Sequence, residues 1–74
     1  MLGKDVRRIR EGLEMDRDEF AEFLCLSSYN ALMNIETDYR RPNKFVMRFL
    51  RYLDSVSKKN AKVLIEELKR HEPK

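Results

Sequence analysis

The chain has 74 residues, which is enough for one domain with a small hydrophobic core and too few for an enzyme pocket with lids. Charged residues make up 39% of the chain and hydrophobic residues 42%, so we expect a folded, soluble domain, and two glycines and two prolines disfavour turn-rich β architectures. The net charge of +3 excludes no partner by itself, because its distribution along the chain decides whether a nucleic-acid surface exists.

Hydrophobic residues at helical spacing predict a first helix over residues 4–13. Val6, Ile9 and Leu13 recur at steps of three and four, while charged residues occupy the other faces. A second helix is expected to begin at Asp16, because Glu19 follows three residues later, which is the spacing of a capping box. That helix ends near residue 25, and its buried side should comprise Phe20, Ala21 and Leu24, with Phe23 at the edge.

A short polar turn at residues 26–28 separates the second helix from a third. We expect Ser28 to cap the third helix, which covers residues 29–36 and buries Leu32 and Ile35. Its outward side is polar and uncharged, and it comprises Tyr29, Asn30, Met33 and Asn34.

Residues 37–42 lack apolar periodicity and are expected to form a basic loop, with Arg41 extended because it precedes Pro42. Asn43 should cap a fourth helix. The residues expected to point inward from it are Phe45, Val46, Phe49, Leu50 and Leu53. A fifth helix begins after Ser55 or Ser57, and the residues of its apolar stripe are Ala61, Leu64, Ile65 and Leu68.

These elements predict an all-α fold, a compact bundle of four to five short helices with a helix-turn-helix formed by helices two and three. We expect a single domain over residues 1–71, with a core at 4–54 and an additional C-terminal helix at about 57–71. Residues 72–74 are expected to be a frayed tail.

In this order the parts resemble the helix-turn-helix domains of the lambda-repressor-like, or xenobiotic-response-element, family of bacterial and phage transcription regulators. The resemblance covers roughly residues 6–53, and it rests on the segment MDRDEFAEFLCLS, on the third helix ending Ile35-Glu36, on the basic loop and on the apolar fourth helix. Cys25 and Asp38 stand where the family usually has glycine, and the turn is one residue longer. We expect the longer turn to relax the torsion at Cys25, and Asp38 to tolerate the left-handed region.

The resemblance implies sequence-specific recognition of double-stranded DNA. The residues that would present to base edges are Tyr29, Asn30, Met33 and Asn34. Those that would hold phosphates are Arg17, Ser28, Arg40 and Arg41. Independently of the resemblance, the cluster of cations after the third helix adds Lys44 to the expected phosphate contacts. Arg10 would pair with Glu36 inside the domain. Asparagine suits a bidentate contact with adenine, and methionine suits contact with a thymine methyl group.

Each assignment has a simpler alternative. The two asparagines can merely solvate a surface helix, and Arg48 and Arg51 can belong to a solvated face. The carboxylates of the second helix should point away from DNA, because phosphate would repel Asp18, Glu19 and Glu22. The apolar stripe of the fifth helix can dock on its own domain or form a dimer seam, since two-fold pairing matches a palindromic site.

The function expected is that of a small homodimeric repressor which recognises an inverted-repeat operator through the major groove. The alternative is an antitoxin-like or adaptor module that binds a protein partner with its C-terminal helix and in which DNA binding is secondary. RNA binding is less favoured, because the third helix lacks the aromatic platform on which single strands stack.

Other chemistry finds little support in the sequence. The single cysteine excludes an intramolecular disulfide and a paired-cysteine metal site, and it suits a reducing cytoplasm. His71, the only histidine, is not placed to activate a serine or the cysteine, and no glycine-rich phosphate loop is present. We expect no enzyme activity, no cofactor, no metal and, without a long apolar run or signal peptide, no membrane partner and a cytoplasmic location.

Overall fold

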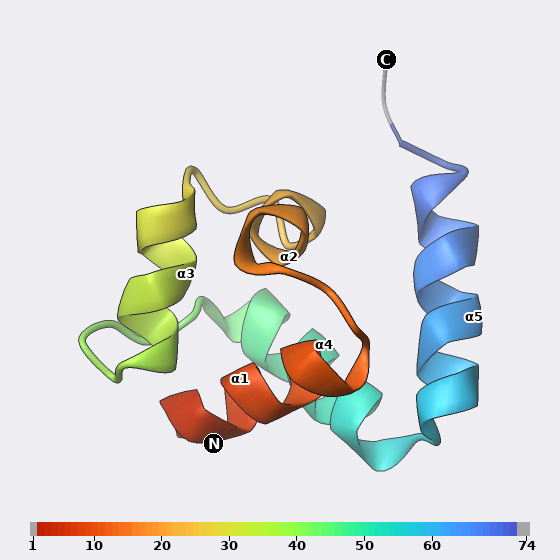
Figure 1. Ribbon diagram of the computed structural model, residues 1–74, viewed down its shortest axis with the longest axis horizontal. Coiled ribbons are helices and arrows are strands. Elements are labelled where there is room, and N and C mark those ends of the chain that lie inside the picture. The colour runs from red at the N-terminus through yellow and green to blue at the C-terminus, as the bar shows by residue number, and fades with distance from the viewer. Residues whose placement is uncertain (1, 73–74) are drawn as a thin grey trace.

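The computed structural model describes residues 2–72, and within them the chain forms five α-helices and no strand. These are α1 (Gly3–Gly12), α2 (Arg17–Phe23), α3 (Tyr29–Glu36), α4 (Lys44–Ser55) and α5 (Lys58–Lys69). The predicted all-α bundle is confirmed, with α2 packed on α3 across a short turn (Figure 1). Of the expected frayed tail, residues 73 and 74 lie outside the described residues.

Side-chain caps fix where the later helices begin. The carboxylate of Asp16 accepts a hydrogen bond from the amide of Glu19 at 2.8 Å, while the carboxylate of Glu19 accepts from the amide of Asp16. Ser28, Asn43 and Ser57 cap α3, α4 and α5 in the same way, each accepting from the amide three residues ahead. All the predicted caps are therefore confirmed, and each satisfies one of the unpaired amides of a helix start.

The start of α1 is held by a residue far along the chain. Asp38, in the loop after α3, accepts a hydrogen bond from the amide of Gly3 at 2.7 Å, and Asp5 accepts from the amide of Leu2 at 2.9 Å. Both carboxylates lie where the helix dipole favours negative charge. A side chain at position 3 would meet the backbone of Glu36, because a Cβ there would clash with its carbonyl oxygen. Glycine thus allows α1 to approach α3 closely.

The hydrophobic core draws on all five helices, and its four fully buried large side chains are Val6, Phe20, Leu32 and Leu50. One predicted core residue is wrong: the side chain of Phe45 is 71% exposed. The inward side of α4 is centred on Val46, Leu50 and Leu53, and a residue one position before Val46 is rotated by about 100° away from it. Phe49, at the border, is half-buried against Phe23, with ring centroids 5.8 Å apart.

The first three helices end in the same hydrogen-bonded motif, in which the residue after the cap takes a left-handed conformation. Glu14, Cys25 and Asp38 have φ angles of 59°, 60° and 65°. After α2, for example, Leu26 donates to the carbonyl of Ala21 and Cys25 donates to that of Glu22, which is the Schellman arrangement. The longer turn was expected to relax the torsion at Cys25, and this expectation is wrong, because the motif itself requires positive φ there.

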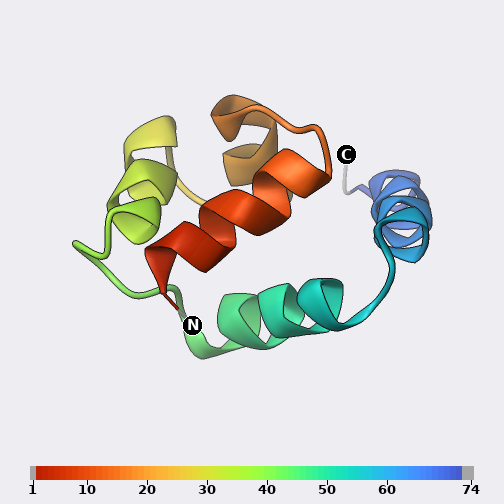
Figure 2. The ribbon, with the colours of Figure 1, turned by 60° about the horizontal axis from the view of Figure 1, so that its bottom comes forward.

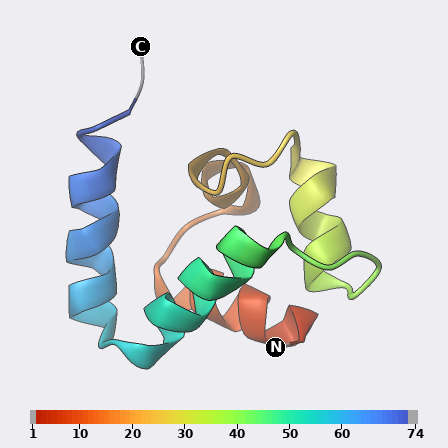
Figure 3. The same cartoon turned by 180° about the vertical axis from the view of Figure 1, so that it is seen from behind.

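The helices are arranged so that α3 and α5 lie at opposite edges of the molecule (Figures 1 and 2). Helix α1 contacts α3 and α4, and α4 crosses the side of the domain that faces the viewer in Figure 3. Helix α3 and the loop after it therefore occupy one end of the domain, α5 occupies the other, and α2 lies between them.

Candidate nucleic-acid interface

Part of the side of α3 that was predicted to present to base edges is exposed to solvent. Leu32 and Ile35 are buried against the core, whereas Tyr29 and Asn30 are exposed. Met33 and Asn34, which were also expected to face away, are half-buried. They lie in the last turns of α3, where the chain folds back: the carbonyl of Asn34 accepts from the amides of the next loop at 2.9 and 3.1 Å. The first turn of α3 is consequently its most accessible part.

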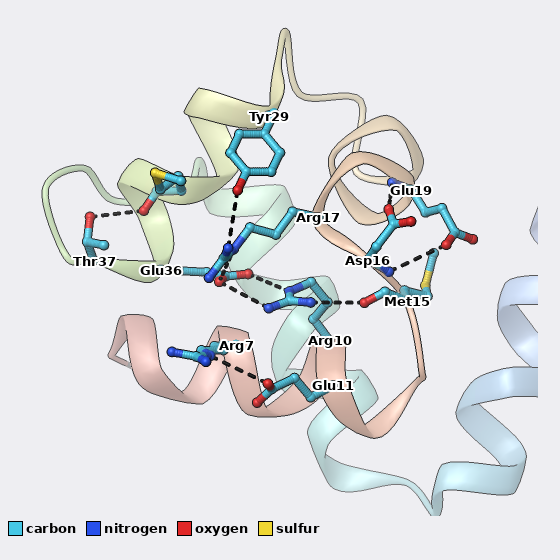
Figure 4. Close-up of polar contacts among 11 residues, drawn as sticks. Arg7, Arg10, Glu11, Met15, Asp16, Arg17, Glu19, Tyr29, Glu36 and Thr37 are labelled. Carbon is cyan, nitrogen blue, oxygen red and sulfur yellow. Dashed lines mark hydrogen bonds and ion pairs between the residues drawn. The ribbon is translucent and has the colours of Figure 1, made fainter.

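A buried carboxylate links α3 to both preceding helices (Figure 4). One oxygen of Glu36 accepts from Nε of Arg10 at 2.8 Å, and the other accepts from Nε of Arg17 at 3.1 Å. The Glu36 side chain is only 3% exposed and that of Arg10 is 10% exposed. A second nitrogen of Arg10 donates to the carbonyl of Met15 at 3.0 Å. The expected pairing of Arg10 with Glu36 is present, and it fixes the angle of α3 relative to α1.

Arg17, which was expected to hold phosphate, is engaged within the domain. Besides Glu36, its guanidinium donates to the hydroxyl of Tyr29 at 3.2 Å and lies 5.9 Å from the centre of that ring. These hydrogen bonds, first to Tyr29 and then to Glu36, raise the pKa of Arg17 above its ordinary value. Arg17 therefore orients Tyr29 at the start of α3 (Figure 4). No sequence signal indicated this, because Arg17 contacts residues twelve and nineteen positions further along the chain.

The basic loop places positive charge beside the end of α3. Arg40 and Arg41 are exposed, as is Lys44 at the first position of α4. Within residues 2–72 none of the ion pairs includes any of the three. The guanidinium of Arg40 lies 6.0 Å from the ring centre of Tyr39. The single carboxylate of the loop, Asp38, is turned to the start of α1, so it does not neutralise these cations.

The acidic residues of α2 lie elsewhere. Asp18, Glu19 and Glu22 are exposed, and the last two line a shallow groove that Lys69 of α5 also borders. Because α5 is at the edge opposite α3, these two carboxylates point away from the reading side, as expected.

The apolar stripe of α5 is divided between the core and the surface. Ala61 and Ile65 are buried, and Leu64 is partly buried against the core. Leu68 is 42% exposed and Val63 is 56% exposed. Most of the stripe therefore docks on its own domain, and only its C-terminal end is open to another molecule.

Comparisons of the chain with protein-family models, with curated proteins and with solved structures find no match. Within residues 2–72, no helix has the length and apolar character needed to cross a membrane. The same part of the chain holds no group of three or more metal-ligating side chains arranged around one point. Any function must therefore be argued from the geometry of the surfaces described above.

Proposed function

We propose that this chain is a sequence-specific, double-stranded DNA-binding regulator of the lambda-repressor-like type, and not an enzyme. The observation that carries the proposal is the way the fold exposes α3. This capped, eight-residue helix is held to α1 by the buried ion pair between Glu36 and Arg10. Its exposed side chains are polar and uncharged, and arginines that form no ion pair within the described part of the chain follow its C-terminal end. This combination matches what a helix needs in order to lie in the major groove.

Base readout in this proposal comes from α3. The major groove is about 12 Å wide and admits a helix, and an Asn side chain matches the donor and acceptor pattern of adenine. Asn30 is exposed at the second position of α3, one turn before the half-buried Asn34. Met33 can contact a thymine methyl group. Tyr29, held by Arg17, can donate to a phosphate or pack on a sugar.

Affinity in this proposal comes from the cations around α3. Arg40, Arg41 and Lys44 would neutralise phosphates and release counterions. The exposed cap at Ser28 adds backbone amides at the positive end of the α3 dipole. Arg17 contributes indirectly, by positioning Tyr29, rather than as a free phosphate ligand.

The regulator is proposed to act as a homodimeric repressor on an inverted repeat with half-sites about one helical turn apart. One helix as short as α3 reads few base pairs, and a two-fold dimer doubles the site. The open C-terminal end of α5, with the exposed side chain of Leu68, is available for this pairing without covering α3, which lies at the opposite edge.

Selection of bound duplexes from random DNA tests the proposal. The expected result is an enriched, inverted-repeat motif. Asn30→Ala should relax the preference at one position of each half-site, whereas Arg41→Ala should weaken all duplexes alike and reduce the salt dependence by about one phosphate contact. Lys59→Ala, which removes an exposed charge from α5, is the matched control and should change neither. Failure to enrich any motif at moderate salt would refute sequence-specific binding.

A second candidate function is an adaptor or antitoxin-like module that binds a protein partner through α5. The exposed side chains of Val63 and Leu68 favour it. Leu68→Asp is the appropriate test variant, because Leu64 packs on the core and a charge there would disturb the fold. If this variant no longer bound a stoichiometric protein partner but still bound duplex DNA, the result would support the adaptor or antitoxin-like function. Loss of dimerisation would instead assign α5 to self-association.

A further inference from the structure

Helix α4 carries aromatic rings on its outer side that the core does not use. Phe45 is 71% exposed and Tyr52 is 53% exposed. Phe49, half-buried against Phe23, lies between them in the sequence. The spacing of four and then three residues places all three rings on one side of the helix. Since one turn of helix rises about 5.4 Å, Phe45 and Tyr52 are separated by roughly 10 Å along the axis.

A row of cations runs beside these rings. Lys44, Arg48 and Arg51 are exposed, and at about 100° per residue they lie on the flank of α4 next to the aromatic side. No acidic residue occurs anywhere between residues 39 and 53. Within residues 2–72, no ion pair includes any of these three cations. We call the surface formed by Lys44, Phe45, Arg48, Arg51 and Tyr52 the α4 face.

The charge of the α4 face restricts what can cover it. A second copy pairing through this face by a two-fold axis would set the same cations against each other, which is unfavourable. The exposed cations that flank both exposed rings favour an anionic ligand. A polyanion that also carries flat apolar groups can contact both the cations and the aromatic rings of this surface. In a duplex the base faces are stacked inside and cannot reach the rings, but in a single strand they can.

We propose that the α4 face binds single-stranded nucleic acid. Bases stack on Phe45 and Tyr52, and the phosphates between them are held by Lys44, Arg48 and Arg51. The α4 face is separate from the outer side of α3: α4 is nearest the viewer in Figure 3, and α3 lies at the edge. The proposal does not rest on duplex recognition, although Arg40 and Arg41 of the intervening loop can serve both surfaces.

The test is fluorescence anisotropy with labelled oligo(dT) and oligo(U) of about 12 nucleotides, a length within the site sizes of single-strand binders. Both probes should bind at low salt and weaken as salt rises. Phe45→Leu and Tyr52→Leu keep apolar area but remove the aromatic face, so each should weaken binding about tenfold. Tyr52→Phe should bind as the unaltered chain does. Val63→Ala, at a comparably exposed apolar site on α5, is the matched control.

Other outcomes separate the alternatives. Binding of oligo(U) but not oligo(dT) would identify RNA as the ligand. Absence of binding to both probes at low salt would overturn the proposal. Binding by the two leucine variants as tight as that of the unaltered chain would also overturn it, because it would show that the bases do not stack on the rings. If Asn30→Ala weakened binding of the single-stranded probes as much as Phe45→Leu did, the binding site would lie on α3. The proposal for the α4 face would then be refuted.

Discussion

The ion pair between Arg10 and Glu36 allows a sharp test of what holds α3 in place. We expect Glu36→Gln to preserve the shape of the side chain while leaving Arg10, at 10% exposure, without a negative partner. Removing one member of a buried pair costs about 3–5 kcal/mol. A 74-residue domain has a total free energy of unfolding of about 4–11 kcal/mol, so about a quarter or more of its stability should be lost.

Urea unfolding followed by far-ultraviolet circular dichroism measures this loss, and a double-mutant cycle isolates the pair. The cycle uses Arg10→Met, Glu36→Gln and the double variant. The matched control is the cycle for Arg7 and Glu11, which lie on α1 at 3.5 Å with more than half of each side chain exposed (Figure 4). That exposed pair should show a coupling of only about 0.3–0.5 kcal/mol.

The buried pair should show a coupling of about 2–3 kcal/mol. Arg10→Met should also leave the carbonyl of Met15 without its donor, which costs about 1–3 kcal/mol beyond the loss of the pair. A coupling no larger than that of Arg7 and Glu11 would contradict the structural role assigned to Glu36. It would mean that core packing alone orients α3.

Three further variants test the backbone and the surface. Gly3→Ala should destabilise the domain by about 2 kcal/mol or more in thermal unfolding, because the new Cβ meets the carbonyl of Glu36; an unchanged melting temperature would refute the close approach. Cys25→Gly should stabilise it by about 1 kcal/mol, since φ is positive there, and a loss of stability would contradict the cap assignment. Arg8 lowers the pKa of Asp54. Their pairing therefore stabilises the fold above the ordinary carboxyl pKa of 3.8 and ceases to do so as pH falls through the lower folded value. The melting-temperature gap between Asp54→Asn and the unaltered chain should close in acid.

The sequence was sufficient to predict features that depend on local chemistry. Capping residues such as Asp16 and Ser28 act on amides three positions ahead, so helix starts could be located without knowledge of the tertiary fold. The buried stripe of α2 followed from helical periodicity in the same way. These local signals explain why the order and type of all five helices agree with expectation.

Apart from the torsion at Cys25, which a local motif sets, the features that were predicted wrongly or not at all depend on tertiary contacts. Phe45 fits an apolar periodicity as well as Phe49 does, and only the direction from which the core meets α4 excludes it. The link from Arg17 to Glu36 and Tyr29 joins segments whose proximity no local pattern encodes. Asp38 was expected to tolerate its torsion, but its bond to the amide of Gly3 spans 35 positions. Contacts of this kind decide which polar residues are free to bind a ligand.

The central claim is that the exposed start of α3 enters the major groove, with the loop arginines on the backbone. The most direct measurement is the amide nuclear magnetic resonance spectrum of the full chain during titration with a selected duplex. The largest shifts should fall on residues 28–34 and on Arg40 and Arg41. Shifts confined to α5 or to α1, with the amides of α3 unmoved, would contradict the claim.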